Sequence, residues 1–357
     1  MIKLLHAADL HLGSPFRGLP PEKAASRRSE QRRLPELLAD LYHDQGCDGM
    51  LLSGDLFDGA AAREDMEALT RALERCGPVF IAPGNHDFYS AASPYHTARW
   101  PRNVHIFTRP VIESVALPEL DLRVWGAGFR DMDCPGLLAG FTARGPEAYQ
   151  VMVLHGDPTT TDSPCCPVTR AQVENSSLHY LALGHIHKGG AFRAGTTLCA
   201  WPGCPMGRGF DETGDKGALI VTLDGEANAQ FFPLSTRRYQ RLTLEAGSDP
   251  AAALENALPA ETSRDIYRVI FQGEAEDLDL QALKDRFTSR FYHLELRDET
   301  VPKVDTWESA GEDTLEGLFF RKLRDALGEA GPDEQRQLVL AARLVRRFLD
   351  GRQEELP

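Results

Sequence analysis

Eight side chains have the types and spacing of metal ligands or acid–base groups. They are carboxylates, an amide and imidazoles, and each cluster of them follows a short apolar run: Asp9, His11, Asp55, Asn85, His86, His155, His185 and His187. Carboxylate and imidazole together suit Mn²⁺, Fe²⁺ or Zn²⁺. The set is too large for one tetrahedral ion, so the carboxylate of Asp55 is expected to bridge two ions about 3.5–4 Å apart.

Each fragment also has an ordinary structural explanation when taken alone. A histidine at a strand end is usually structural, Gly84-Asn85 suits a turn with positive φ, and Gly54-Asp55 suits a helix N-cap. A structural origin for the whole set would require five unrelated clusters of costly polar groups at the rim of one sheet. The set therefore predicts a metal centre.

Apolar runs and helical patterns alternate ahead of the first three clusters. Lys3 to Ala7, Met50 to Leu52 and Val79 to Ala82 indicate buried strands, and the leucine spacing predicts helices over 34–41 and 66–73. Strand, helix, strand, helix, strand is typical of an α/β protein. Ligands of open α/β sheets bind at the carboxyl ends of strands, so the polar clusters are expected to meet at one edge.

The remaining chain predicts three domains. Further strands are expected in the first domain over 104–107, 111–115, 122–125, 151–154, 180–183 and 218–223. After Arg238, three alternating runs and one helical pattern indicate a small α+β unit, over 239–244, 266–271, 292–296 and 278–291. Two apolar stripes then predict a pair of helices on either side of Gly331-Pro332. The predicted domains are 1–238, 239–303 and 304–357.

The order of the polar motifs resembles that of the calcineurin-type metallophosphoesterases. The motifs are Asp9-Leu10-His11, Gly54-Asp55-Leu56-Phe57-Asp58, Gly84-Asn85-His86-Asp87, His155-Gly156 and Gly184-His185-Ile186-His187. The resemblance implies an α/β sandwich of two central mixed sheets flanked by helices. It also implies one metal on Asp9, His11, Asp55 and His187, and another on Asp55, Asn85, His155 and His185. His86 is then free to face the substrate.

This metal set implies phosphoester hydrolysis. A hydroxide that bridges two divalent cations is a nucleophile at neutral pH and attacks phosphorus in line. His86 is expected to assist the transition state and to donate a proton to the leaving oxygen. Asp58 is the expected partner of His86, although some nucleases of this superfamily carry a histidine at that place. Its role therefore stays open.

Several further stretches resemble the SbcD-type DNA repair exonucleases, and among them the bacterial YhaO branch. These stretches are Met1 to Gly13, 51–58, 93–95 with 100–107, and 201–203 with 207–217. The resemblance implies a Mn²⁺-dependent exonuclease subunit, with a capping domain over 239–303 that guides duplex DNA. It also implies C-terminal helices that dock on an SbcC-type SMC-like ATPase, and a possible homodimer. Two structural alternatives stay open: residues 201–217 only close the sheet, and the helices pack on their own domain.

Basic residues predict where DNA phosphates would be contacted. Arg27, Arg28, Arg32 and Arg33 are expected to form one phosphate-contacting edge, and Arg208 is a further candidate. A run of charge is also typical of a solvated helix face, so that alternative stays open.

Composition limits the class of protein. The net charge of −14 argues against a simple DNA-coating protein, although bound cations and a local basic groove can reverse the field. The seven cysteines are irregularly spaced and no export signal is recognised, so we expect reduced thiols in the cytoplasm. No apolar run approaches 20 residues, so we expect no membrane span. Two other functions stay open: a phosphatase or small-molecule phosphodiesterase, and a non-catalytic scaffold for the ATPase.

Overall fold

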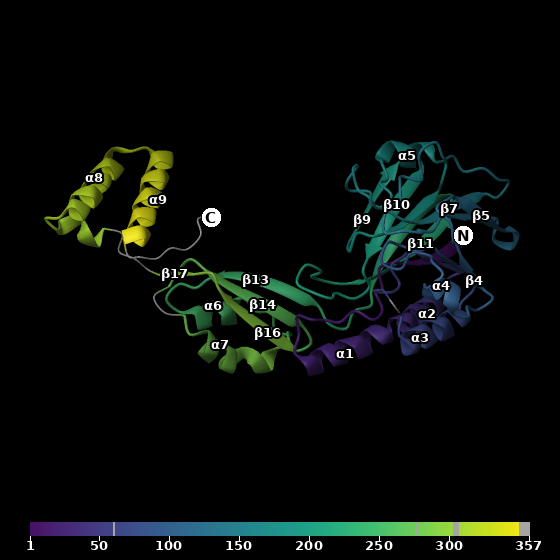
Figure 1. Ribbon diagram of the computed structural model, residues 1–357, viewed down its shortest axis with the longest axis horizontal. Coiled ribbons are helices and arrows are strands. Elements are labelled where there is room, and N and C mark those ends of the chain that lie inside the picture. Colours follow the sequence, from purple (N-terminus) through teal and green to yellow (C-terminus); the bar gives the residue numbers. More distant parts are fainter. Residues whose placement is uncertain (60, 276–277, 303–306, 350–357) are drawn as a thin grey trace. The chain divides into compact units, whose positions relative to one another are not determined.

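The computed structural model describes residues 1–59, 61–275, 278–302 and 307–349 (Figure 1). The chain divides into two units. The first unit contains Met1–Arg241, Glu261–Arg268 and Arg290–His293, and the second contains Leu242–Ala260, Val269–Ser289 and the described residues from Leu294 onward. The predicted boundary between 303 and 304 lies outside the described residues, and the three predicted domains stay predictions.

The first unit contains two six-stranded mixed sheets. The order of one sheet is β12-β11-β1-β2-β3-β4, and its strands are β1 (Ile2–Ala7), β2 (Gly49–Leu52), β3 (Val79–Ile81), β4 (Val104–Ile106), β11 (Gly217–Asp224) and β12 (Glu226–Pro233). The order of the other is β5-β6-β7-β8-β10-β9, and its strands are β5 (Glu113–Leu117), β6 (Leu122–Gly126), β7 (Tyr149–His155), β8 (Tyr180–Gly184), β9 (Lys188–Ala194) and β10 (Thr197–Gly203). Strands β1 to β4 are parallel, as are β6, β7, β8 and β10, so their carboxyl ends point the same way within each sheet.

The core follows from the two-residue period of the strands. Leu4 and Leu51 pack into the layer that also contains Val151 of the other sheet, whereas Leu5 packs into the layer beneath the helices with Leu69. The helices of this unit are α1 (Pro21–Arg32), α2 (Leu34–Asp44), α3 (Arg63–Glu74), α4 (Pro94–Thr97) and α5 (Arg170–Asn175). The predicted α/β sandwich, two mixed sheets flanked by helices, is confirmed.

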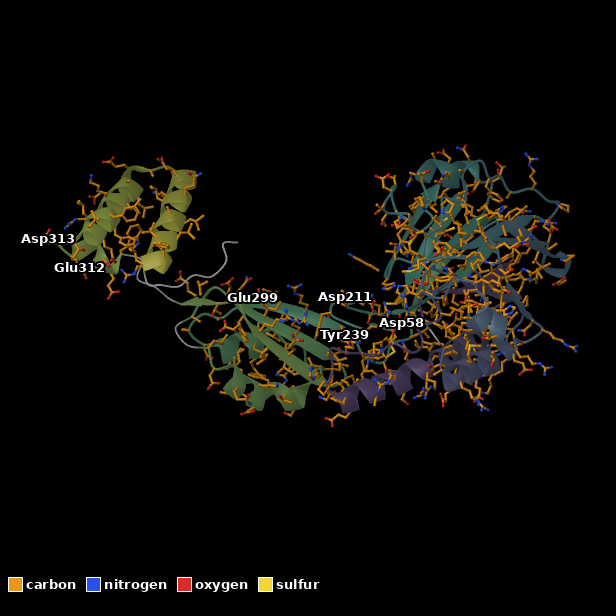
Figure 2. The ribbon with its side chains drawn as sticks, in the orientation of Figure 1. Asp58, Asp211, Tyr239, Glu299, Glu312 and Asp313 are labelled. Atoms are coloured by element: carbon orange, nitrogen blue, oxygen red, sulfur yellow. The ribbon has the colours of Figure 1, made fainter. Side chains whose placement is uncertain are left out.

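The described part of the second unit contains most of a three-stranded sheet, in the order β13-β14-β16, a two-stranded sheet of β15 and β17, and four α-helices. Its strands are β13 (Tyr239–Glu245), β14 (Ile266–Gln272), β15 (Glu274–Ala275), β16 (His293–Asp298) and β17 (Val301–Pro302). Its helices are α6 (Pro250–Ala257), α7 (Leu280–Phe287), α8 (Leu315–Glu329) and α9 (Pro332–Leu349). Glu312 and Asp313 lie just before α8 (Figure 2), and the hydroxyl of Thr314 caps that helix by accepting from the Gly317 N–H.

Some elements carried too little sequence signal to be predicted. The buried face of α1 consists of Ala24, Arg27 and Gln31, so this helix has no apolar stripe. Strand β12 is largely exposed on both faces. An edge strand of this kind shows no regular alternation of apolar and polar residues, because only Ala227 and Phe232 of the strand pack into a core.

Candidate dinuclear metal centre

The predicted ligands lie at the carboxyl ends of the parallel strands of the first unit or in the turns that follow them, and His155 is the last residue of β7. Asp9 and His11 follow β1, Asp55 follows β2 and His185 follows β8. These four residues have φ values of 54°, 45°, 52° and 91°, a region that non-glycine residues rarely adopt. Half of the eight non-glycine residues with positive φ in the described part of the chain are therefore predicted ligands. Backbone strain of this kind concentrates at functional sites.

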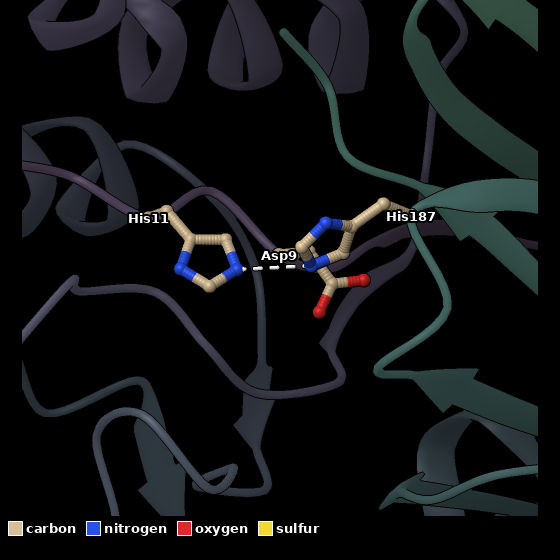
Figure 3. A group of neighbouring side chains, drawn as sticks. All are labelled: Asp9, His11 and His187. Carbon is tan, nitrogen blue, oxygen red and sulfur yellow. Dashed lines mark hydrogen bonds between the residues drawn. The ribbon is translucent and has the colours of Figure 1, made fainter. Parts of the chain in front are cut away.

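Three of the predicted ligands of one metal converge in Figure 3. The ε nitrogens of His11 and His187 are 3.1 Å apart, and the Asp9 carboxylate lies beside them. Asp9 Oδ1 accepts a hydrogen bond from the His185 N–H at 3.0 Å. Asp9 Oδ2 is buried and has no hydrogen-bond partner among the described residues. An orphaned buried carboxylate oxygen beside two ring nitrogens fits a cation site.

The predicted ligands of the other metal meet around the side-chain oxygen of Asn85. This oxygen lies 2.9 Å from His155 Nε2 and 3.2 Å from His185 Nδ1. His155 Nδ1 lies 2.8 Å from the Ser53 carbonyl, to which it donates, so Nε2 of the neutral ring carries a lone pair. Two lone pairs that face each other at 2.9 Å repel unless a cation lies between them. This arrangement also fits a metal ion.

The carboxylate of Asp55 lies between the two groups. Its Oδ2 is 3.7 Å from His11 Nε2 and 3.5 Å from His155 Nε2. Its Oδ1 accepts from the His86 N–H at 2.9 Å, which fixes the orientation of the carboxylate. Asp55 Oδ2 is thus near ligands predicted for both metals, and its bridging role stays a prediction.

Two glycines permit this close approach. A Cβ atom on Gly84 would lie 2.3 Å from Asp55 Oδ1, and a Cβ atom on Gly54 would lie 2.6 Å from His155 Nδ1. Both distances are shorter than any tolerable contact, and Gly54 also has a φ of +86°. The glycines of the two motifs are therefore required by the packing of the ligands.

The electrostatics of the centre favour a bound cation. Burial raises the pKa of Asp9 to about 7, with the Asp55 charge adding to the effect and His187 opposing it. Burial also raises the pKa of Asp55 and lowers that of His155 and of His185 to about 4. The imidazoles of His155 and His185 are thus neutral, as metal ligands must be, while the positive charge near the buried carboxylates does not offset their burial. Divalent cations would supply further positive charge, so the donor set fits the two-metal prediction.

His86 differs from the ligands because its side chain is 47% exposed. Its Nδ1 lies 3.4 Å from Asp58 Oδ1, and its ring packs edge-on against the ring of His11 at 4.8 Å. Asp58 (Figure 2) also accepts from the Ser14 hydroxyl at 3.2 Å. An accessible imidazole beside a carboxylate and next to the ligands is suitably placed for proton transfer to a substrate.

The predicted basic edge needs a correction at Arg27. Its side chain is fully buried, donates to the Gly207 carbonyl at 3.0 Å and to Glu30 at 2.5 Å, and lies over the ring of Phe16. Arg27 therefore holds α1 against the 201–217 segment and does not face solvent. Arg28 and Arg32 on α1 and Arg33 just after it are exposed, and their contact with phosphates stays a prediction. Arg32 is paired with Asp65 at 2.8 Å.

Asp87 belongs to one of the motifs but had no predicted role. Its buried carboxylate accepts from the backbone N–H groups of Gly84, at 2.8 Å, and Leu56, at 2.6 Å. It also accepts from the Tyr95 hydroxyl at 2.5 Å. Asp87 thus ties the turn after β3 to the turn that carries Asp55. The signal was present in the motif, but Tyr95 was not detectable from spacing.

Glu212 was also missed. Its Oε1 lies 2.7 Å from His187 Nδ1, and Arg208 donates to the same carboxylate at 2.8 Å. Burial alone would raise the pKa of Glu212. Hydrogen bonds from His187 and Arg208 nevertheless hold this pKa well below its usual range. The 201–217 segment therefore does more than close the sheet, because it contacts a predicted metal ligand. Arg208 is largely committed to Glu212, and a phosphate contact by Arg208 stays a prediction.

The cysteines show no sign of a second metal site. All seven are buried free thiols, and none belongs to a cluster with metal-ligand spacing in the described part of the chain.

No helix within residues 1–59, 61–275, 278–302 and 307–349 combines the length and apolarity that a bilayer crossing requires.

Comparisons with known proteins support the family that the motifs resemble. A family model for calcineurin-like phosphoesterase matches residues 2–189, which contain every predicted metal ligand. The chain is 29% identical over 328 residues to the uncharacterized metallophosphoesterase YhaO of Bacillus subtilis (strain 168), covering 84% of this chain and 79% of that protein. It is 26% identical over 264 residues to the SbcD subunit of the SbcCD nuclease from the same strain, covering 62% of this chain and 66% of that one.

Two solved structures also align with the chain. TT1561 of Thermus thermophilus is 13% identical, with a TM-score of 0.41 over 64% of this chain and 98% of that one. A dimetal phosphatase from Danio rerio is 12% identical, with a TM-score of 0.41 over 65% of this chain and 99% of that one.

Proposed function

The chain belongs to the calcineurin-like phosphoesterase family, and on this premise we propose that it is a two-metal DNA exonuclease subunit that acts in DNA repair. The observation that carries the two-metal chemistry is the position of Asp55 Oδ2, 3.7 Å from His11 Nε2 and 3.5 Å from His155 Nε2. DNA as the substrate is supported by the 26% identity to a nuclease subunit.

The proposed mechanism assigns one task to each part of the site. Asp9, His11, Asp55 and His187 would hold one Mn²⁺, and Asp55, Asn85, His155 and His185 would hold the other. Two divalent cations held there would lower the pKa of a water nucleophile to near neutral and would offset phosphoryl charge. His86, with Asp58 at 3.4 Å, faces the substrate and donates a proton to the leaving oxygen.

A paired hydrolysis assay tests the substrate. Protein with Mn²⁺ is given end-labelled blunt duplex DNA, closed circular duplex DNA, a simple phosphodiester and a phosphomonoester, with His86→Ala protein as the control for contaminating nuclease. The proposal predicts shortening of the linear duplex from its ends, an intact circle and an inactive variant. Cleavage of the small esters alone, also in the presence of the ATPase, would contradict it and favour a phosphatase or small-molecule phosphodiesterase.

We also propose that α8 and α9 dock on an SMC-like ATPase of the SbcC type. The two helices and the short 3₁₀ helix Glu308–Gly311 share a small core of Ala310, Phe320 and Ala342. Large apolar side chains remain exposed outside that core, at Leu315, Leu318, Phe319, Leu340, Phe348 and Leu349. Exposed apolar side chains grouped on one helix pair are typical of a protein-binding surface.

Co-purification with the SMC-like ATPase of the same genome tests this docking. The variant Leu318→Gln with Phe348→Gln should lose the ATPase. The matched control, Val111→Gln with Met132→Gln, changes two exposed apolar residues of the first unit and should keep the ATPase. Equal recovery of the ATPase by both variants would reject the helices as the docking surface. The proposed location is the cytoplasm, supported by the seven free thiols, and a homodimer stays a prediction.

A further inference from the structure

Residues 204–216 hold both the side chain and the backbone of His187. Glu212 Oε1 lies 2.7 Å from Nδ1 of the ring. The backbone carbonyl of His187 accepts from Lys216 Nζ at 3.1 Å and from the Cys204 N–H at 3.4 Å. Glu212 and Lys216 are both buried. A predicted metal ligand is thus fixed by a part of the chain that supplies no predicted ligand itself.

The contact with Glu212 decides which nitrogen of His187 faces the other ligands. The Glu212 carboxylate already accepts from the Arg208 N–H at 2.7 Å and from the Arg208 guanidinium at 2.8 Å, so it acts as an acceptor. Nδ1 of His187 must therefore carry the proton of the 2.7 Å hydrogen bond. Nε2 is left as the metal-binding nitrogen, and it is Nε2 that lies 3.1 Å from His11 Nε2.

Arg208 makes the buried carboxylate tolerable. Its guanidinium and backbone both bond to Glu212, whose side chain is only 4% exposed. Arg208 Nη2 also lies 3.1 Å from His187 Nδ1, but both atoms are donors, so this is a contact and not a hydrogen bond. The guanidinium thus balances the charge of Glu212, and the imidazole is the group that the carboxylate orients.

We propose that Glu212 is a positioning residue of the metal centre, which holds His187 in the Nδ1–H form so that Nε2 binds the cation shared with Asp9 and His11. A carboxylate that accepts from the second nitrogen of a metal-binding histidine fixes the ring and raises its basicity. The inference rests on the proposed dinuclear centre, but it does not depend on DNA being the substrate.

Mn²⁺ binding by equilibrium dialysis, with metal analysis of both compartments, provides the test. The wild-type protein should bind two Mn²⁺. Glu212→Ala should weaken one of the two sites by about 10- to 100-fold and leave the other unchanged. The Mn²⁺ affinity of Glu212→Gln at that site should lie between those of the wild type and Glu212→Ala. The glutamine amide oxygen still accepts from Nδ1–H, but it carries no charge. NMR of protein with ¹⁵N-labelled histidine should show the Nδ1–H form of His187 in the wild type. In Glu212→Ala it should show a mixture of the Nδ1–H and Nε2–H forms.

Glu147→Ala is the matched control. Glu147 pairs with Arg123 at 2.8 Å, and these side chains are 8% and 21% exposed, against 4% and 20% for Glu212 and Arg208. The control should bind two Mn²⁺ normally. Unchanged Mn²⁺ affinity in Glu212→Ala and Glu212→Gln would overturn the positioning role while the two-metal centre stands. A wild-type protein that binds fewer than two Mn²⁺ would overturn the proposed centre, and this inference with it.

Discussion

His11 Nε2 and His187 Nε2 face each other across 3.1 Å, although the two residues follow strands of different sheets (Figure 3). His11 follows β1, and His187 follows β8. The site of one predicted metal is therefore assembled only when the two sheets pack together. The metal centre and the sandwich should consequently stabilise each other.

Mn²⁺ is expected to stabilise the folded protein. A ligand at 100 times its dissociation constant adds about 2.7 kcal/mol per site to the free energy of unfolding, provided that it binds only the folded state. Urea unfolding with Mn²⁺ and with EDTA measures this gain. His187→Ala should lose part of it, and His96→Ala, which changes an exposed histidine outside the ligand set, should not. Equal unfolding free energies with Mn²⁺ and with EDTA would argue against a metal site that requires the fold.

His86→Ala should lower kcat on a simple phosphodiester by roughly 100- to 10,000-fold, because it removes the proposed proton donor. Mn²⁺ binding should be unchanged, since His86 is not a predicted ligand and its side chain is 47% exposed. Steady-state kinetics and Mn²⁺ dialysis on the same preparations separate the two effects. The exposed His96→Ala variant is the control. A kcat within about threefold of the wild type would remove His86 from the mechanism.

Buried His6 should make the fold less stable in mild acid. Burial lowers the pKa of His6 to about 3, and its ring bonds to Ser53 Oγ and Tyr180 OH, each at 2.7 Å. Both states are neutral above pH 6.5. Below it, the unfolded state takes up a proton that the folded state refuses until about pH 3, so stability falls as pH falls. The loss at pH 5 should be about 2 kcal/mol.

Urea unfolding of the wild type and of His6→Gln at pH 7.5 and pH 5, both with EDTA, measures this contribution. The variant is expected to be less stable at both pH values, because it loses hydrogen bonds to Ser53 and Tyr180. Between pH 7.5 and pH 5, the free energy of unfolding should fall less in the variant than in the wild type, by about 2 kcal/mol. If the free energy of unfolding falls equally in both proteins between pH 7.5 and pH 5, His6 does not contribute to the loss of stability in acid.

Tyr95→Phe should weaken both the fold and Mn²⁺ binding. It removes a donor from the buried Asp87 carboxylate, and a hydrogen bond to a charged group contributes about 1.5–3 kcal/mol. Asp87 also holds the turn of Asp55, so the predicted bridging ligand should become less well ordered. Tyr42→Phe is the control, because its hydroxyl accepts from Gly77 N–H away from the ligands. Wild-type Mn²⁺ affinity in Tyr95→Phe would show that the Asp55 turn does not need this contact.

The exposed arginines of the predicted DNA edge should set the salt dependence of binding. Replacing Arg28, Arg32 and Arg33 by Ala should weaken duplex binding, and each lost phosphate contact should flatten the slope of log K against log salt by about 0.9. The control variant loses the same number of positive charges, because Arg71, Arg99 and Arg102 are replaced by Ala. These three arginines line a concave surface beside the N-terminal ends of β3 and β4. Fluorescence anisotropy over a salt series measures both. Identical slopes for the two triple variants would reject the proposed edge.

The sequence by itself determined the strand-end clusters and the order of the motifs. Asp9, Asp55, Asn85 and His155 each follow an apolar run, and this is a local property that spacing reveals. The α/β class was equally predictable, because alternation within strands and leucine spacing within helices depend on near neighbours. The positions of the predicted metal ligands needed no knowledge of long-range contacts.

Tertiary structure alone decided which residues support those clusters. Glu212 reaches His187 across 25 positions, and Tyr95 reaches Asp87 through a turn with no repeating pattern. The burial of Arg27 was likewise hidden, since an arginine in a charged run is usually solvated and only the contacts with Gly207 and Glu30 make burial favourable. Such contacts depend on how separate segments pack, and no local period in the sequence records that packing.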